Sequence, residues 1–330
     1  MQFIIIIILL QLRKMRYASV FTGLLTCVNA AAISRSQSVS NPFYYFAFGD
    51  SYTTTTFNNR GTQPSPGNPL GNPPLGQGTF SGGPNYVGWL TTKYNSTTVL
   101  TYDFAIGGAT ITDSLVPTAD PSIHTFEQQV KMYFETQYTS GSSPGKIWAS
   151  DNSIFSIFFG INDIGLPLTS EPQYLKDMNT RIPELLDYYF SLCANLYNQG
   201  ARRFMFVGVP PSDRSPYIEG LGSSVSAQWS AWANNFNGQL AARIPQFTAN
   251  YAGSVAATYD YHRWMTLVLD SPTTYGFPDA TCINSNGVSC IWWNNYHPGS
   301  RLNDLLAQRM LPAMNSLGFD GSKPVGGYFY

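Results

Sequence analysis

The chain has 330 residues, of which 43% are hydrophobic and 15% aromatic, and this is enough for a large buried core. Charged residues make up 11% of the chain, well below the roughly one quarter that is usual in soluble proteins, and the formal net charge is -1. Binding to phosphate backbones needs clustered Lys and Arg, and the body of the chain has no basic run. The composition therefore excludes nucleic acid as a partner.

The N-terminus has the pattern of an export signal. Residues 15–30 combine a basic start, an apolar stretch and small residues at Val28-Asn29-Ala30. The Ile-rich run before them, residues 1–12, is too short to span a bilayer. We interpret residues 1–14 as an upstream extension of a start at Met15. An uncleaved membrane anchor is the alternative.

Cleavage after the signal would remove basic residues and no acidic ones, so the exported chain would be more acidic. No break in composition and no internal repeat marks a second domain. The sequence therefore predicts a signal peptide (1–30), a linker (31–42) and one domain (43–330). The predicted product is a secreted, extracellular monomer without stable membrane association.

The cysteines agree with export. Cys27 leaves with the signal, whereas Cys282 and Cys290 lie close together in a loop rich in Gly, Asn and Ser, which predicts a local disulfide. Cys193 follows Leu192 in an apolar segment and is expected to be a buried free thiol. The alternative is that all three remaining cysteines are unpaired. Asn95 begins a glycosylation sequon, Asn-Ser-Thr.

Strand-like and helix-like segments alternate along the chain. Five short runs are rich in β-branched or aromatic residues and predict strands at 43–49, 99–105, 153–160, 203–209 and 254–261. Segments with helical spacing of apolar residues predict helices at 86–94, 125–138, 174–198, 226–251 and 301–317. This alternation predicts a parallel sheet covered by helices on both faces.

One long segment, residues 57–84, does not fit this alternation. It follows the first predicted strand, is full of Gly, Pro and Asn, and has almost no periodicity. Long loops of this kind are usually functional or disordered. In a parallel α/β sheet, the loops at the carboxyl ends of the strands build the ligand crevice.

Polar residues and glycines follow three of the predicted strands. Ser51 comes after a strand-ending Gly-Asp, where backbone N–H groups can face an anion. Gly107 and Gly108 allow the backbone to approach a ligand closely, and Asn162 can offer an N–H to a developing oxyanion. Each signal has a plain structural alternative, which is a turn for Ser51 and the glycines and a helix cap for Asn162.

A serine nucleophile needs a neighbouring base, and imidazole has a suitable pKa. The chain has three histidines. His297 lies in a loop before the last predicted helix and is the preferred candidate. His262, directly after a predicted strand, is the rival base, and His124 lies beside a predicted helix.

The order of these residues resembles the SGNH/GDSL hydrolases, whose four blocks carry Ser, Gly, Asn and His. The matching segments are Gly49-Asp50-Ser51-Tyr52, Gly107-Gly108-Ala109, Gly160-Ile161-Asn162-Asp163 and His297-Pro298. The resemblance extends over residues 43–317. It implies an α/β fold of the three-layer α/β/α flavodoxin-like type, with a five-stranded parallel sheet, and neither a metal nor an organic cofactor.

The resemblance also implies a role for each residue. Ser51 would attack an ester carbonyl, and His297 would take its proton and later deliver it to the leaving alcohol. The backbone N–H groups of Ser51 and Gly108 and the side chain of Asn162 would form the oxyanion hole. We choose Gly108 over Gly107 because the second glycine matches the more regular position of the family.

The sequence departs from the family at one catalytic position. The family usually has Asp three residues before the catalytic His, and here that residue is Asn294. An Asp orients the imidazole and stabilises the imidazolium, whereas Asn can only accept a hydrogen bond. The resemblance therefore implies a Ser-His pair assisted by Asn294 or by a backbone carbonyl.

Among the subfamilies, the chain looks most like secreted fungal acetylesterases of carbohydrate esterase family 16. This resemblance rests on Phe48-Gly49-Asp50-Ser51-Tyr52-Thr53, on Phe104-Ala105-Ile106-Gly107-Gly108-Ala109 and on the Trp-rich run before His297. It implies removal of acetyl groups from sugars derived from hemicellulose, so that the partner is a small ester or an acetylated oligosaccharide.

Aromatic residues near the predicted crevice can stack on sugar rings, and the foremost of them are Tyr52, Trp292 and Trp293. Packing in the core is the alternative for each of them.

Two other functions remain open from the sequence. A lipase for longer acyl chains would need a long apolar lid, whereas residues 57–84 are polar and rich in Gly and Pro. A weakly active or non-catalytic carbohydrate-binding protein would explain Asn294.

Overall fold

The computed structural model describes residues 42–169 and 178–321. They build a five-stranded, fully parallel sheet, as predicted, and its strand order is β2-β1-β3-β4-β5. The strands are β1 (Phe43–Gly49), β2 (Val99–Asp103), β3 (Ser153–Phe158), β4 (Arg203–Val207) and β5 (Val255–Tyr259). The predicted signal peptide and the linker up to residue 41 lie outside the described residues.

The central strands are rich in apolar residues because helices cover both of their faces. All seven residues of β1 and all six of β3 are buried. Phe46 of β1 stacks on Phe155 of β3 and on Tyr102 of β2, with ring centroids 4.9 and 5.3 Å apart. At the edge of the sheet, Val255 of β5 is 48% exposed. Aromatic packing across β2, β1 and β3 thus forms the centre of the core.

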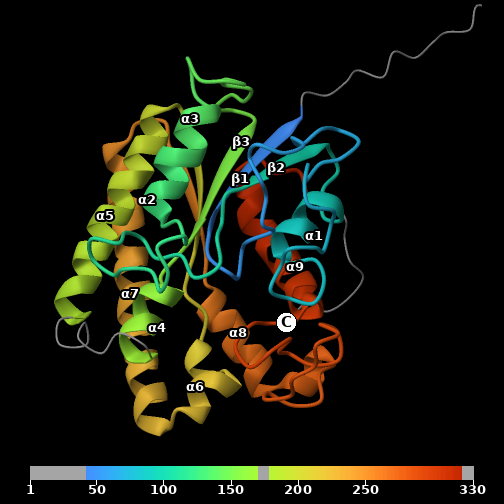
Figure 1. Ribbon diagram of the computed structural model, residues 1–330, viewed down its shortest axis with the longest axis vertical. Coiled ribbons are helices and arrows are strands. Elements are labelled where there is room, and N and C mark those ends of the chain that lie inside the picture. Colours follow the sequence, from blue (N-terminus) through green and yellow to red (C-terminus); the bar gives the residue numbers. More distant parts are fainter. Residues whose placement is uncertain (1–41, 170–177, 322–330) are drawn as a thin grey trace, which may run out of the picture. The chain divides into compact units, whose positions relative to one another are not determined.

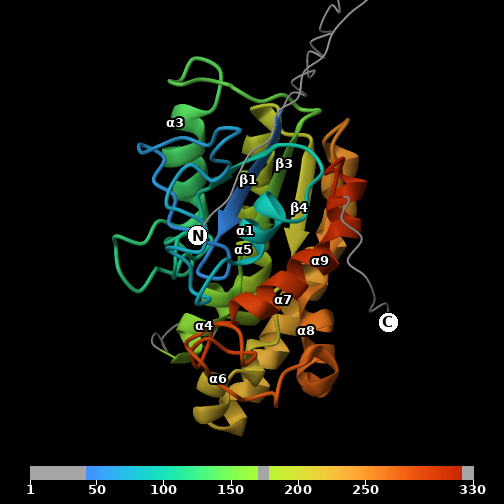
Figure 2. The same ribbon diagram turned by 90° about the vertical axis from the view of Figure 1, so that its right-hand side faces the viewer.

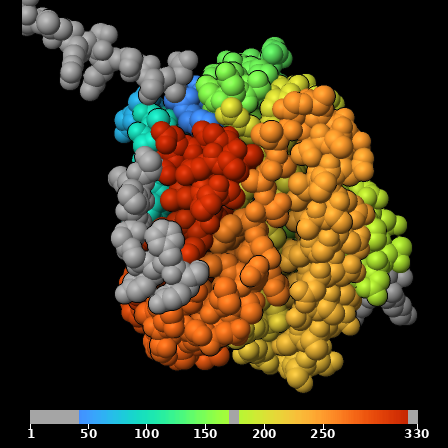
Figure 3. All heavy atoms as spheres, turned by 180° about the vertical axis from the view of Figure 1, so that it is seen from behind, coloured from blue at the N-terminus to red at the C-terminus, as the bar shows by residue number. Residues whose placement is uncertain are grey.

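The helices lie in two layers. They are α1 (Tyr86–Thr92), α2 (Phe126–Gln128), a π-helix (Gln129–Phe134), α3 (Glu135–Gln137), α4 (Ile161–Thr169), α5 (Met178–Asn198), α6 (Pro216–Gly220), α7 (Ser223–Asn250), α8 (Tyr261–Asp270) and α9 (Ser300–Ser316), with 3-10 turns at Ser212–Arg214 and Pro272–Tyr275. Figures 1 and 2 show α1 and α9 on one face of the sheet and α2, α3, α5 and α7 on the other. Seen from behind, the segments from α7 to α9 lie next to one another on this face (Figure 3). Within the described part of the chain, no helix combines the length and apolarity needed to cross a bilayer.

Element boundaries differ from the predicted ones at the carboxyl ends of the strands. Only β1 ends where predicted, whereas β2 to β5 each end two residues earlier than predicted. The residues after β3 and β5 begin α4 and α8, which the sequence analysis missed. Asp260 caps α8 by accepting a hydrogen bond from the N–H of Arg263 at 2.9 Å. The start of the predicted helix 174–198 lies partly outside the described residues.

Residues 57–84 form a long loop that is held by its own side chains. The amide nitrogen of Asn72 donates to the carbonyl oxygens of Asn58 and Thr62 at 2.9 and 2.8 Å. Tyr138 donates to the side chain of Gln63 at 2.7 Å and thereby ties the loop to the segment after α3. These contacts fix the course of a segment that has no periodic structure, and the end of the loop reaches Ser51.

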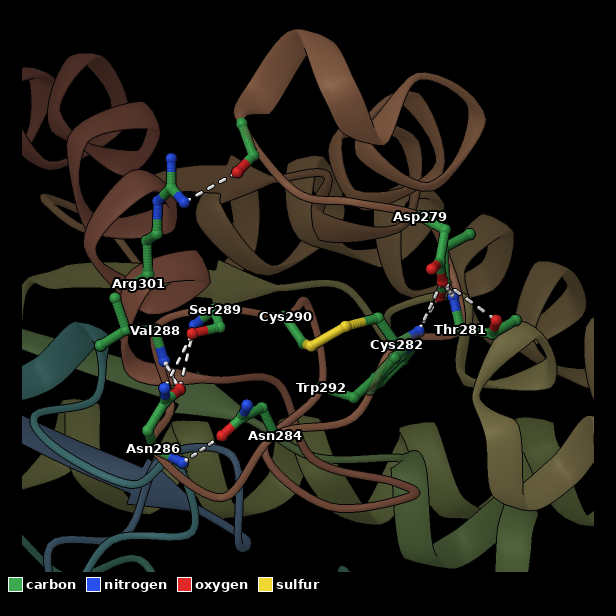
Figure 4. Close-up of a disulfide and its surroundings, with 12 residues drawn as sticks. Asp279, Thr281, Cys282, Asn284, Asn286, Val288, Ser289, Cys290, Trp292 and Arg301 are labelled. Atoms are coloured by element: carbon green, nitrogen blue, oxygen red, sulfur yellow. Dashed lines mark hydrogen bonds between the residues drawn. A yellow bond between two sulfur atoms is a disulfide. The ribbon is translucent and has the colours of Figure 1, made fainter.

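A second irregular segment connects α8 to α9 and carries the disulfide between Cys282 and Cys290, which confirms the predicted pairing (Figure 4). Asp279 accepts the backbone N–H of Cys282 at 2.7 Å, and Asn286 accepts that of Ser289 at 3.0 Å. Short polar side chains of this kind fix turns by bonding the backbone. Cys193 is a buried free thiol, as predicted.

Candidate active site

Ser51 lies in a tight turn at the carboxyl end of β1. The side chain of Asp50 accepts the N–H of Tyr52 at 2.9 Å, and the Asp50 carbonyl accepts the N–H groups of the next two residues. A Cβ on Gly49 would lie 2.6 Å from Oγ1 of Thr53, so only glycine fits where the strand enters the turn. The turn presents Ser51, which is 9% exposed, at the edge of the sheet where the other blocks converge.

His297 contacts Ser51 from the opposite end of the sequence. Its Nε2 atom lies 2.8 Å from Oγ of Ser51. The rings of Tyr52 and Phe80 lie beside the imidazole, with centroids 5.5 and 5.1 Å from it. Burial lowers the pKa of His297 from 6.5 to about 4. The imidazole is therefore neutral over most of the pH range and can accept the serine proton.

Asn294 occupies the position behind the imidazole. Its Oδ1 atom accepts the N–H groups of His297 and Tyr296 at 2.7 and 2.9 Å, and it lies 3.2 Å from Nδ1 of His297. One neutral oxygen thus serves three donors. It fixes the loop and the tautomer with Nδ1 protonated, but it brings no charge to stabilise an imidazolium.

Backbone N–H groups face the space beside Ser51. Ile106 to Ala109 form a turn closed by a 3.1 Å hydrogen bond, with Gly108 at φ +83°. A Cβ on Gly107 would lie 3.7 Å from Cβ of Ser51, so this turn adjoins the serine. Within the described ranges, the N–H groups of Ser51 and Gly108 have no acceptor. They are available to an oxyanion.

The first turn of α4 clamps this glycine turn. Nδ2 of Asn162 donates to the carbonyl of Ala109 at 2.9 Å, and Oδ1 of Asp163 accepts the N–H of Ile111 at 2.9 Å. Asp163 is fully buried. The sequence analysis assigned no role to it, although its place next to Asn162 in the third block was a signal. A primary amide has two N–H donors, so Asn162 retains one for a ligand.

Comparison with known proteins agrees with this geometry. The family model described as GDSL-like Lipase/Acylhydrolase matches residues 45–310. The chain belongs to this GDSL family. It is therefore an ester hydrolase, and the predicted family and fold class are confirmed.

Curated relatives of this GDSL hydrolase include fungal and plant esterases. An acetylesterase of Thermothelomyces thermophilus is 40% identical over 275 residues, which cover 82% of this chain and 87% of the relative. A GDSL esterase/lipase of Arabidopsis thaliana is 25% identical over 259 residues, covering 68% and 72%. Among solved structures, an acetylxylan esterase of Geobacillus stearothermophilus has 12% identity and a TM-score of 0.48, covering 87% of this chain and 99% of its own.

Two of the predicted sugar-stacking residues of this GDSL hydrolase are core residues, and the prediction for them is wrong. Trp292 is fully buried, and its Nε1 donates to the carbonyl of Ala280 at 2.7 Å. Tyr52 is 4% exposed, and its hydroxyl donates to the carbonyl of Tyr296 at 2.7 Å. Both rings hold in place the loop that carries His297, which we call the histidine loop. Trp293 is half-buried and stays a candidate.

His262, the rival base, lies on α8. Within residues 42–169 and 178–321 it forms no hydrogen bond with Ser51, whose imidazole partner is His297. Across the same ranges, no cluster of three or more His, Cys, Asp or Glu is placed to hold a metal ion.

Buried carboxyl groups make the folded state of this GDSL hydrolase more stable at mildly acidic than at alkaline pH. Burial raises the pKa of Asp50 to about 8, and burial likewise raises the pKa values of Asp103 and Asp163 to about 7. The folded state thus retains protons that the unfolded state releases above about pH 4. The stability contributed by these protonated carboxyl groups is lost progressively as pH rises from about 4 to between 7 and 8. His297 acts oppositely, because its lowered pKa costs stability as pH falls from 6.5 to about 4.

We expect the temperature of thermal unfolding to be higher at about pH 5.5 than at about pH 8.5, because three carboxyl groups outweigh one imidazole. Asp163→Asn keeps an acceptor for Ile111 and removes one titrating group, so it should reduce the difference. A higher unfolding temperature at the alkaline pH would contradict this result.

Proposed function

We propose that this GDSL hydrolase is a secreted acetylesterase that uses Ser51 and His297 to remove acetyl groups from sugars derived from hemicellulose. The observation that carries the proposal is the 2.8 Å contact between Oγ of Ser51 and Nε2 of His297, beside two backbone N–H groups that have no acceptor among the described residues. The 40% identity to an acetylesterase supports the acetyl group as the acyl part.

The reaction follows from the placement of the donors. Oγ of Ser51 attacks the ester carbonyl while Nε2 of His297 takes its proton. The carbonyl oxygen becomes an oxyanion, which accepts hydrogen bonds from the N–H groups of Ser51 and Gly108 and from the second amide proton of Asn162. His297 then protonates the leaving alcohol, and an acetyl-enzyme remains. Water, deprotonated by His297, attacks the acetyl carbonyl. The bond from this carbon to Oγ of Ser51 then breaks, Oγ takes the proton back from His297, and acetate leaves.

Asn294 sets how well the imidazolium is stabilised in both steps. In Asn294→Asp a carboxylate would lie about where Oδ1 now stands, 3.2 Å from Nδ1 of His297. The added charge favours the imidazolium, so we expect kcat to rise about tenfold and the acid limb of the pH profile to move to higher pH.

The matched control is Asn295→Asp, which adds the same charge at the exposed neighbouring position. It should leave both quantities unchanged. An Asn294→Asp enzyme with unchanged kcat and an unmoved acid limb would show that this position is not coupled to the imidazole.

Secretion is supported by the signal pattern in residues 1–30 and by the Cys282–Cys290 disulfide, since disulfides persist in oxidising compartments. Glycosylation at Asn95 stays a prediction. Nδ2 of Asn95 donates to the carbonyls of Leu90 and Thr91 at the end of α1. A glycan on this nitrogen would replace one of these two hydrogen bonds.

The experiment that tests the proposal is acetate release from acetylated xylo-oligosaccharides, with the Ser51→Ala protein as control. We expect release by the wild-type protein and none above background by the variant. Equal release by both proteins, or hydrolysis of nitrophenyl acetate without any release from the oligosaccharides, would contradict the proposed substrate.

A further inference from the structure

One aromatic side chain from the long loop lies over the Ser51–His297 pair. Phe80 is 37% exposed, and its ring is tilted by 30° against the imidazole at a centroid distance of 5.1 Å. Its ring also meets that of Trp293 edge-on at 6.4 Å. No role for Phe80 is predicted from the sequence, because a lone aromatic in a loop rich in Gly and Pro carries no pattern.

The three substituents of a bound carbonyl carbon point in different directions. The oxygen points to the N–H groups near Gly108 and Asn162, and the leaving alcohol must reach Nε2 of His297. The third substituent, the acyl group, needs a separate space. A narrow recess adjoins Ser51, and its lining includes Ser51 and Phe80 but not Gly108, Asn162 or His297.

Two asparagines that line this recess, Asn85 and Asn303, are held in place by hydrogen bonds. Asn85 donates to the carbonyl of Thr53 at 2.5 Å and accepts the N–H of Gly88 at 3.1 Å. Asn303 donates to the carbonyl of Gly299 at 3.0 Å and accepts the N–H of Tyr86 at 3.2 Å. Both asparagines are at least 97% buried, and their amides bind backbone. Of the residues that line the recess, Phe80 alone is exposed.

We propose that this recess takes the acyl substituent and that Phe80 is the specificity-determining residue that limits it to short groups. The inference rests on the proposed function, since it names the residue that makes the enzyme an acetylesterase. Phe80 shortens the recess at its outer end, and removing the ring opens the recess to solvent and to longer chains.

Gly107 sets the position of the Phe80 ring from the other side. A Cβ on Gly107 would lie 3.0 and 3.1 Å from Cε2 and Cζ of Phe80, which is closer than ordinary contact. Gly107 is not among the glycines with positive φ, so alanine is conformationally allowed there. The ring of Phe80 is therefore the group that Gly107→Ala displaces from its place beside His297.

The test is an acyl-length series of nitrophenyl acetate, butyrate and octanoate with wild type and Phe80→Ala. We expect the octanoate-to-acetate ratio of kcat/KM to rise at least about tenfold in Phe80→Ala, mainly through a lower KM for octanoate. Leu75→Ala is the matched control, because Leu75 lies on the same loop, is 43% exposed and does not line this recess. It should keep the wild-type ratio.

A second comparison separates the role of the ring from a loss of folding. Gly107→Ala should lower kcat/KM for nitrophenyl acetate about tenfold, and much less than that in the Phe80→Ala background, because the displaced ring is then absent. An equal loss in both backgrounds would overturn the inference. An unchanged octanoate-to-acetate ratio of kcat/KM in Phe80→Ala would also overturn it. The same holds if Phe80→Ala changes the preference only among acetyl esters of different alcohols.

Failure of the proposed function can be told apart from failure of this inference, because the wild-type protein would then hydrolyse none of the esters. In that case the recess is tested by the rates at which methyl- and hexylphosphonate nitrophenyl esters modify the protein, followed by intact mass. We expect Phe80→Ala to accelerate the hexyl reagent relative to the methyl reagent, and an unchanged relative rate would contradict the inference.

Discussion

Ser51→Ala and His297→Ala are each expected to lower kcat for nitrophenyl acetate by on the order of 10⁴- to 10⁶-fold. Oγ of Ser51 and Nε2 of His297 share one short contact, so neither group can act in the reaction without the other. The double variant should therefore be no slower than the worse single variant. The measurement is steady-state hydrolysis at saturating ester, with thermal unfolding to show that each variant is folded.

The control for the base is His262→Ala, assayed per folded molecule. His262 lies on α8 and is not bonded to Ser51 within the described residues, so we expect kcat to stay within about twofold of wild type. A loss in His262→Ala as large as that in His297→Ala would contradict the assignment of the base.

Asn162→Ala is expected to lower kcat by about 10²- to 10³-fold with little change in KM, because its amide binds the oxyanion more strongly than the ground-state carbonyl. The variant also loses the hydrogen bond to Ala109, which would loosen the glycine turn. Asp163→Ala serves as the matched control, since it removes the other clamp of the same turn and no oxyanion donor.

We expect Asp163→Ala to lower the unfolding temperature more than Asn162→Ala does, because it leaves the buried N–H of Ile111 without its acceptor. Its effect on kcat should be the smaller of the two. A loss of less than about threefold in Asn162→Ala, or a larger kcat loss in Asp163→Ala, would remove Asn162 from the proposed oxyanion hole.

The fold could be predicted because its strands carry local signals. β1 and β3 are buried on both faces, so they are rich in apolar residues and bounded by turn residues, and β1 was predicted to the residue. The carboxyl ends of parallel strands meet at one edge, which is why Ser51, Gly108 and Asn162 could be grouped before any coordinates were known. The helices α4 and α8 were missed because they begin directly after strands.

The chemistry around the site depends on contacts that sequence spacing does not encode. Ser51 and His297 are 246 positions apart, and their spacing left His262 open as a rival base. The burial of Trp292 follows from how the histidine loop packs and not from its composition. The position of Phe80 likewise depends on the path of the long loop. Side-chain hydrogen bonds set this path, and they leave no periodic pattern in the sequence.

The central claim is that Ser51 is the nucleophile, and covalent trapping tests it most directly. The protein is treated with diethyl nitrophenyl phosphate until ester hydrolysis stops, digested, and analysed by mass spectrometry. We predict one diethylphosphoryl group per chain, on the peptide that contains Ser51, and no labelling of Ser51→Ala or His297→Ala. Inactivation with the label on another residue, or loss of activity without any label, would contradict the account.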